Sequence, residues 1–264
     1  MTAPLLEIAD VTAGFGATTV LHGVSLTVDE GTIAGIFGLN GAGKSVTLKT
    51  VAGIVPIRSG AILFDGEDIS RWSPEKRVAR GMGHIPQGRQ VFPALTVEEN
   101  LRLGAYTMRR SNRGRYAPAL DGVYDRFPVL RERRGQLAGT MSGGQQASLC
   151  VARALINEPR LVLVDEPSAG LSPVAALELR DVLRDVAASG VTMLLVEQNI
   201  AFGLSLADTA HLMQTGVVVH TAPVAELDQS TLAQHLGIGN VLGAATNRML
   251  SSRSKGKPRG RRTA

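Results

Sequence analysis

Apolar and polar residues alternate near the start of the chain, in LLEIADVTAGF (5–15) and VSLTV (24–28), a pattern that predicts antiparallel strands. Further along, three short runs are almost wholly apolar and are typical of strands buried on both faces. These runs are TIAGIF (32–37), LVLV (161–164) and VTMLLVE (191–197). ILFDGEDI (62–69) contains the pair Asp65-Gly66, which predicts a strand ending in a tight turn.

Helical patterns occur between the buried strands. One helix is predicted over 44–52, and another begins at Ser172-Pro173, a hydroxyl cap followed by proline, and ends before Gly190. From about residue 87 to 156, Arg-rich stretches alternate with helical patches and the strand pattern stops. We therefore predict an α/β fold with a mostly parallel core sheet, an N-terminal antiparallel β subdomain and an inserted α-helical subdomain.

The same patterns predict the domain limits. Residues 1–86 and 157–236 form the core, 87–156 the inserted helical subdomain, and 237–264 a C-terminal tail.

Composition excludes several classes of protein. The 264 residues are 44% hydrophobic, which is typical of a globular chain, but no apolar run approaches the roughly 20 residues of a membrane-spanning helix. The first ten residues lack a basic segment, so no secretory signal is expected and the cytosol is the predicted compartment. A single cysteine, Cys150, excludes an internal disulfide, and we expect it to be a small buried apolar side chain.

The net charge of +5 is concentrated at the C-terminus. Residues 248–264 carry seven Lys or Arg and no acid, which accounts for the whole excess. This composition buries little apolar surface, so we expect a disordered, solvated tail. A contact with anionic lipid or RNA is the alternative use of such a charge block. No specific nucleic-acid partner is predicted.

A glycine-rich loop follows the strand at 32–37. Residues 38–45, which are Gly38, Leu39, Asn40, Gly41, Ala42, Gly43, Lys44 and Ser45, match the pattern G-x-x-x-x-G-K-[ST]. The glycines allow the backbone N–H groups to approach phosphate oxygens, and the helix that follows adds its N-terminal N–H groups. Lys44 supplies positive charge and Ser45 a hydroxyl for Mg²⁺. The loop predicts binding of ATP with Mg²⁺.

Two acids end the strand at 161–164. Asp165 and Glu166 emerge at the carboxyl edge of the predicted sheet, where ligands bind in folds of this kind. We expect Asp165 to orient Mg²⁺ and Glu166 to polarise the water that attacks the γ-phosphate. The alternative is a strand end with two solvated acids.

A third motif lies about 20 residues before Asp165. It consists of Ser142, Gly143, Gly144 and Gln145, within MSGGQ. With the glycine loop and the acid pair in this order, the chain resembles the ATPase subunit of an ATP-binding cassette (ABC) transporter over about residues 5–236. The resemblance implies that Ser142 and the helix that it opens bind the γ-phosphate of ATP held by a second cassette, identical or different. Two cassettes would then enclose two ATP molecules.

Four other positions follow from the resemblance. Gln87 resembles the hinge-loop glutamine that senses Mg²⁺ and the γ-phosphate. Phe15 stands where an aromatic ring stacks on adenine, with a buried core Phe as the alternative. Val46 and Gln198 depart from the family pattern. Where this chain has Val46, many members have a second hydroxyl residue, and where it has Gln198, most members have a histidine. We expect Gln198 to act as a neutral helper of Glu166, since an amide donates a hydrogen bond but does not become cationic.

The amino-acid sequences of four motifs point to one branch of the family. PQGRQVFPALTVEENL, MSGGQQ, SAGLSP and LLVEQN are similar to ATPase subunits of branched-chain amino acid importers and of urea or short-chain amide systems. The resemblance implies integral membrane permease subunits, a periplasmic or extracellular substrate-binding protein, and a peripheral position at the cytoplasmic face of the membrane.

The segment 87–100 is the expected docking cleft for a membrane subunit, although VFPAL within it also fits a core segment. Three other functions stay open: the ATPase of a lipid or polysaccharide exporter, a soluble cassette protein, and a cassette that binds ATP without hydrolysing it.

Overall fold

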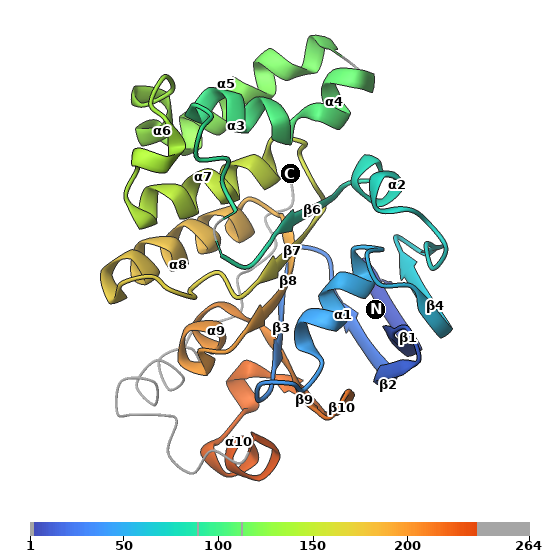
Figure 1. The fold of residues 1–264 in the computed structure, drawn as a ribbon. Coiled ribbons are helices and arrows are strands. Elements are labelled where there is room, and N and C mark those ends of the chain that lie inside the picture. The colour runs from blue at the N-terminus through green and yellow to red at the C-terminus, as the bar shows by residue number, and fades with distance from the viewer. Residues whose placement is uncertain (1–2, 89, 112, 237–264) are drawn as a thin grey trace, which may run out of the picture.

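A six-stranded sheet forms the centre of the protein (Figure 1). The computed structural model describes residues 3–88, 90–111 and 113–236. Five strands run parallel, and the sixth, β10, pairs antiparallel with β9 at one edge. In spatial order the strands are β10 (Val217–Pro223), β9 (Thr209–Gln214), β3 (Ile33–Phe37), β8 (Thr192–Glu197), β7 (Leu161–Asp165) and β6 (Met82–Ile85). The mostly parallel sheet predicted from the apolar runs is confirmed.

A second, antiparallel sheet is built from the first part of the chain. Its strands, in spatial order, are β2 (Thr18–Val28), β1 (Leu6–Phe15), β4 (Ile57–Phe64) and β5 (Glu67–Asp68). The predicted turn at Asp65-Gly66 joins β4 to β5, with both residues at positive φ. Together with α1 (Lys44–Val51), this sheet encloses one hydrophobic cluster, which includes Leu21, Leu48 and Phe64.

Helices α3 to α7 group together in the upper part of Figure 1. They are α3 (Val97–Gly104), α4 (Tyr106–Ser111), α5 (Tyr116–Arg126), α6 (Pro128–Glu132) and α7 (Gly143–Leu155). The remaining helices are α2 (Pro74–Ala79), α8 (Pro173–Ala188), α9 (Ile200–Leu206) and α10 (Gln229–Leu236). A second hydrophobic cluster joins α3, α5, α7, α8 and α9 to the other face of the central sheet.

Local sequence signals predicted several of these elements closely. The helix expected from Ser172-Pro173 is α8, and the Ser172 hydroxyl accepts a hydrogen bond from the Ala175 backbone N–H. Cys150 is buried, and burial raises the pKa of its thiol. None of the described helices is long and apolar enough to span a membrane. The predicted tail, 237–264, lies outside the described residues.

Candidate active site

The predicted chemical residues gather at the carboxyl edge of the central sheet. The glycine loop follows β3, Asp165 ends β7 with Glu166 directly after it, and Gln198 follows β8. The loop carrying Gln87 follows β6, the next strand beyond β7. Because these strands are parallel and adjacent, segments distant in sequence converge at one edge.

Two glycines of the loop are required by its geometry. A Cβ atom at Gly38 would lie 2.3 Å from the carbonyl oxygen of Met213, so a side chain is excluded there. Gly43 has φ of 105°, a conformation that side chains disfavour, and it precedes the first turn of α1. No described side chain caps the N-terminus of α1. The first N–H groups of this helix therefore face the loop as donors for an anion.

Lys44 is held inside this loop. Its side chain is 5% exposed, and Nζ donates hydrogen bonds to the carbonyl oxygens of Gly38, at 2.9 Å, and Leu39, at 3.1 Å. Burial lowers the pKa of the Lys44 ammonium, while the charges of Glu166 and Asp165 oppose that shift. The cation is thus positioned at the centre of the loop, where it can meet phosphate oxygens.

Ser45 and Asp165 form an oxygen pair suited to Mg²⁺. The Ser45 hydroxyl donates to Oδ1 of Asp165 at 3.0 Å, and Asp165 is buried. Mg²⁺ prefers oxygen ligands and keeps waters and phosphate oxygens in its shell, so it needs few protein ligands. The described residues contain no group of three or more His, Cys, Asp or Glu side chains that would form a protein-only metal site. A hydroxyl beside one carboxylate therefore fits a magnesium ion that arrives with a nucleotide.

Glu166 and Gln87 are in direct contact. The Gln87 amide donates from Nε2 to Oε2 of Glu166 at 2.6 Å. Glu166 has φ of 44°, an uncommon conformation for a residue with a side chain, and its backbone N–H donates to the Val196 carbonyl at 2.9 Å. This hydrogen bond to β8 therefore holds the strained backbone of Glu166 in place. Oε1 of Glu166 has no hydrogen-bond partner among the described residues, which leaves it available to a water molecule.

Glu197 is a site residue that sequence reasoning missed. It is 1% exposed, and its carboxylate accepts backbone N–H bonds from Ser168 at 2.9 Å and from Asn199 at 2.8 Å. Burial raises the pKa of this carboxyl, and the hydrogen bonds oppose the shift. Glu197 thus ties the loop after Glu166 to the loop that carries Gln198. The signal in the sequence was a second acid at the end of an apolar strand run.

The other predicted residues are placed less centrally. Gln198 is exposed and directly follows β8, which is adjacent to β7, the strand that Glu166 follows. Phe15 ends β1 and is 54% exposed, so the alternative of a buried core Phe is wrong. Val46 lies in the first turn of α1 and packs against the hydrophobic cluster beneath it, where its side chain adds no hydroxyl to the loop.

Ser142 opens α7 as expected, but its hydroxyl serves its own helix. Ser142 and Gln145 form a reciprocal capping box: each side chain pairs with the other residue's backbone N–H, at 3.3 and 3.1 Å. Gly143 and Gly144 form the first turn. Among the described residues, no hydrogen bond joins this helix start to the glycine loop. Figure 1 shows α7 among the upper helices, apart from α1.

The fold and this set of residues define an ATP-binding cassette. A family model described as "ABC transporter" matches residues 21–169. The chain belongs to this family and is an ATPase of the cassette type that binds ATP.

Curated relatives include two subunits of amino acid transporters. The chain is 39% identical to the high-affinity branched-chain amino acid transport ATP-binding protein BraG of Pseudomonas aeruginosa, over 84% of this chain and 95% of the relative. It is 34% identical to the probable branched-chain amino acid transport ATP-binding protein LivF of Archaeoglobus fulgidus, over 90% and 100%.

An export protein and a solved cassette also match. The lipopolysaccharide export system ATP-binding protein LptB of Escherichia coli is 30% identical, over 88% of this chain and 97% of the relative. The ADP conformation of MJ1267, an ATP-binding cassette of an ABC transporter, has a TM-score of 0.74 at 25% identity, covering 84% of this chain and 92% of that one.

Proposed function

We propose that this chain hydrolyses ATP to drive an ABC importer that takes up branched-chain amino acids or related small molecules through separate membrane subunits. The observation that carries the ATPase chemistry is the convergence of two contacts, Ser45 with Asp165 and Gln87 with Glu166, beside the glycine loop. The amino acid assignment is supported by the similarity to BraG and LivF.

Each residue of the site has a separate role in ATP binding or hydrolysis. The loop N–H groups and Lys44 bind the phosphates of ATP, and the exposed ring of Phe15 stacks on adenine. Ser45, Asp165 and Gln87 hold Mg²⁺, which neutralises charge on the phosphate oxygens when it is bound. Glu166 orients the attacking water and accepts its proton through Oε1. The Gln198 amide donates a hydrogen bond to the γ-phosphate.

A second cassette completes the site. The start of α7 is not joined to the glycine loop of its own chain. The Ser142 hydroxyl accepts a bond from its own helix but donates none among the described residues, so its proton and the N–H groups of Gly143 and Gly144 can meet ATP held by another cassette. The second cassette is either a copy of this chain or a related subunit. Such a pair encloses two ATP molecules between two glycine loops and two α7 helices.

A permease subunit docks on the side of the molecule where α2 and α4 meet. A groove of about 790 Å³ lies between these helices, and its lining includes Tyr106, which is 63% exposed. Phe92, in the segment 87–100 that was expected to form the docking cleft, is 49% exposed, as an interface residue would be before assembly. The chain then lies at the cytoplasmic face of the membrane, and the substrate-binding protein acts on the opposite side.

Export is the second candidate direction. The similarity to LptB favours it, because that relative belongs to a lipopolysaccharide export system. The core residues described above serve either direction, since they act on ATP and not on the cargo.

Two experiments test the proposal. Glu166→Gln is expected to abolish phosphate release while ATP remains bound and nucleotide-bound dimers accumulate, because binding and water activation use different groups. Retention of wild-type turnover would refute the role of Glu166. Vesicles carrying this chain with its permease subunits and substrate-binding protein then test the cargo: ATP-dependent accumulation of labelled leucine supports import, and failure to move leucine refutes the amino acid assignment.

A further inference from the structure

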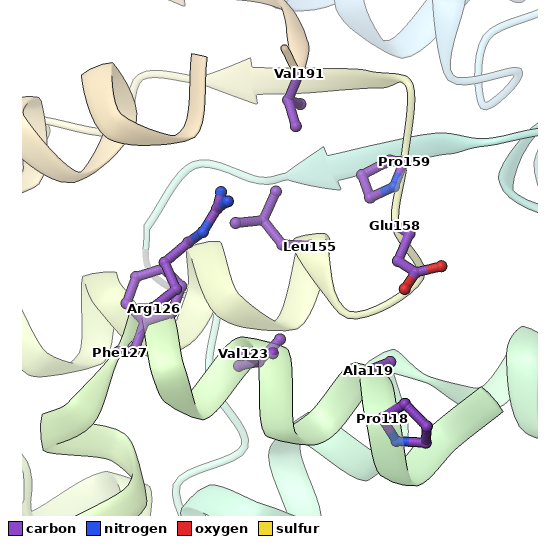
Figure 2. A pocket seen from close by; sticks show the side chains of 10 residues that line it. Pro118, Ala119, Val123, Arg126, Phe127, Leu155, Glu158, Pro159 and Val191 are labelled. Atoms are coloured by element: carbon purple, nitrogen blue, oxygen red, sulfur yellow. The ribbon is translucent and has the colours of Figure 1, made fainter. Parts of the chain in front are cut away.

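A pocket lies at the edge of the central sheet opposite to the candidate active site. Its volume is about 300 Å³, and it is formed between α5 and the connection from α7 to β7 (Figure 2). Pro159 and Val191 line it just before β7 and β8 begin, whereas the nucleotide-site residues follow the carboxyl ends of these strands. The pocket is therefore separate from the ATP site.

Most of the residues that line the pocket have apolar side chains. Val123 and Phe127 contribute from α5 and its end, and Leu155 from the last turn of α7. All three side chains are at least nine-tenths buried, so this side of the pocket is a well-packed wall of the protein. Figure 2 shows Leu155 on α7, between Val123 of α5 and Val191 on the far side. This wall suits a branched or aromatic hydrocarbon body.

Two charged side chains stand on opposite sides of the pocket. Figure 2 shows Arg126 reaching from α5 toward Leu155, and Glu158 on the other side next to Pro159. Glu158 already pairs with Arg115. Arg126 has no hydrogen-bond or ion-pair partner within the part of the chain that the structure describes. The unpaired charge at the pocket is therefore positive, which favours an anionic ligand.

The pocket is open and its backbone is held in place. A Cβ atom added at Gly122, in the middle of α5, would meet no atom within 4 Å, so the absent side chain leaves room for a ligand. Glu158 adopts φ of 52°, and its N–H donates to the Leu155 carbonyl at 2.8 Å. The turn at the end of α7 is thus fixed in a conformation that residues with side chains disfavour.

We propose that this pocket binds a small monocarboxylate with a branched or aromatic apolar body. The carboxylate pairs with the Arg126 guanidinium, and the body packs against Val123, Leu155 and Val191. A pocket of about 300 Å³ is at the small end of the range for ligand sites. A polyphosphate would need several cations, whereas Arg126 is the one unpaired cation among the described lining residues.

Calorimetric titration of the full chain with isovalerate and with phenylacetate tests the proposal. Saturable binding of one of them is expected, with Kd on the order of 0.1–10 mM for so few atoms. Isoamyl alcohol, which has the branched body without the charge, and acetate, which has the charge without the body, are expected to bind at least about tenfold more weakly. Absence of saturable binding by both acids, or equal binding of the alcohol, would overturn the proposal.

Three variants locate the binding. Gly122→Leu fills the pocket with a better helix-forming residue and is expected to weaken binding at least about tenfold without loss of thermal stability. Arg126→Gln is expected to weaken it by roughly five- to tenfold, since the guanidinium lies at a solvent-accessible rim. Arg102→Gln makes the same charge change on α3 and should leave Kd unaltered. Unchanged affinity in both pocket variants would place the binding elsewhere and refute this site.

Discussion

Replacement of Glu197 by glutamine tests whether this carboxylate positions the active-site loops or only stabilises the fold. The Glu197 carboxylate accepts N–H bonds from Ser168 and Asn199 and so holds the two loops that carry Glu166 and Gln198. In Glu197→Gln one amide oxygen keeps one of these bonds, but the amide NH₂ group faces the other backbone N–H. A donor then opposes a donor at a site that is 1% exposed.

The size of the effect follows from this loss. A buried hydrogen bond to a charged group contributes about 1.5–3 kcal/mol, and the burial that raises the pKa of Glu197 offsets part of it. We expect a net loss of about 2 kcal/mol, or roughly 4–8 °C in Tm for a chain of this size. A displacement of Glu166 by about 1 Å lowers turnover by as much as about a hundredfold. We therefore expect kcat to fall at least about tenfold, with KM for ATP within about threefold of wild type.

Phosphate release at saturating ATP, combined with thermal denaturation, gives both quantities. Asp208→Ala is the control, because Oδ2 of Asp208 accepts the Ile33 backbone N–H at 2.9 Å at the amino edge of the sheet, away from the site, and alanine removes this acceptor. The control should lose stability and keep its kcat. If Glu197→Gln behaves like the control, with lowered Tm and wild-type kcat, the positioning role is refuted.

Three other perturbations have definite expected outcomes. Lys44→Ala should weaken ATP binding itself at least about tenfold in an equilibrium titration, since it removes the cation at the centre of the loop; unaltered affinity would contradict this. Arg77→Met should lower the free energy of unfolding by about 3–5 kcal/mol in denaturant titrations, because the guanidinium is buried and donates to carbonyls of Thr50, Val51 and Ile69; the exposed neighbour Lys76→Met is the control. Burial lowers the pKa of His211 to about 4 from an unfolded value of 6.5, so the unfolded chain binds the proton first as pH falls, and stability is lost between about pH 6.5 and pH 4. The loss from pH 7 to pH 5 should be about 2 kcal/mol, and His211→Gln should reduce it; an unchanged pH dependence would refute the assignment.

Elements with strong local signals were predicted well. The apolar runs at β3, β7 and β8, the turn at Asp65-Gly66 and the start of α8 depend on residues close together in sequence. The glycine loop and the acid pair after β7 were predicted for the same reason. The hairpin β9–β10 was not predicted, and α2 and β6 were not recognised as separate elements. These elements are short, and the positions of their apolar residues are explained only by the segments that pack against them.

Periodicity, turn chemistry and motif spacing therefore establish which segments are strands and helices and which residues carry phosphate chemistry, because each of these signals is encoded within a few neighbouring residues. The contacts between Gln87 and Glu166, and between Glu197 and Ser168, join residues 79 and 29 positions apart, and no local signal encodes them. They arise because parallel strands are packed side by side in the order β8, β7, β6, which brings the ends of separate segments to one edge. The pocket at Arg126 has the same origin, since α5 meets the α7–β7 turn only when the helices pack onto the sheet.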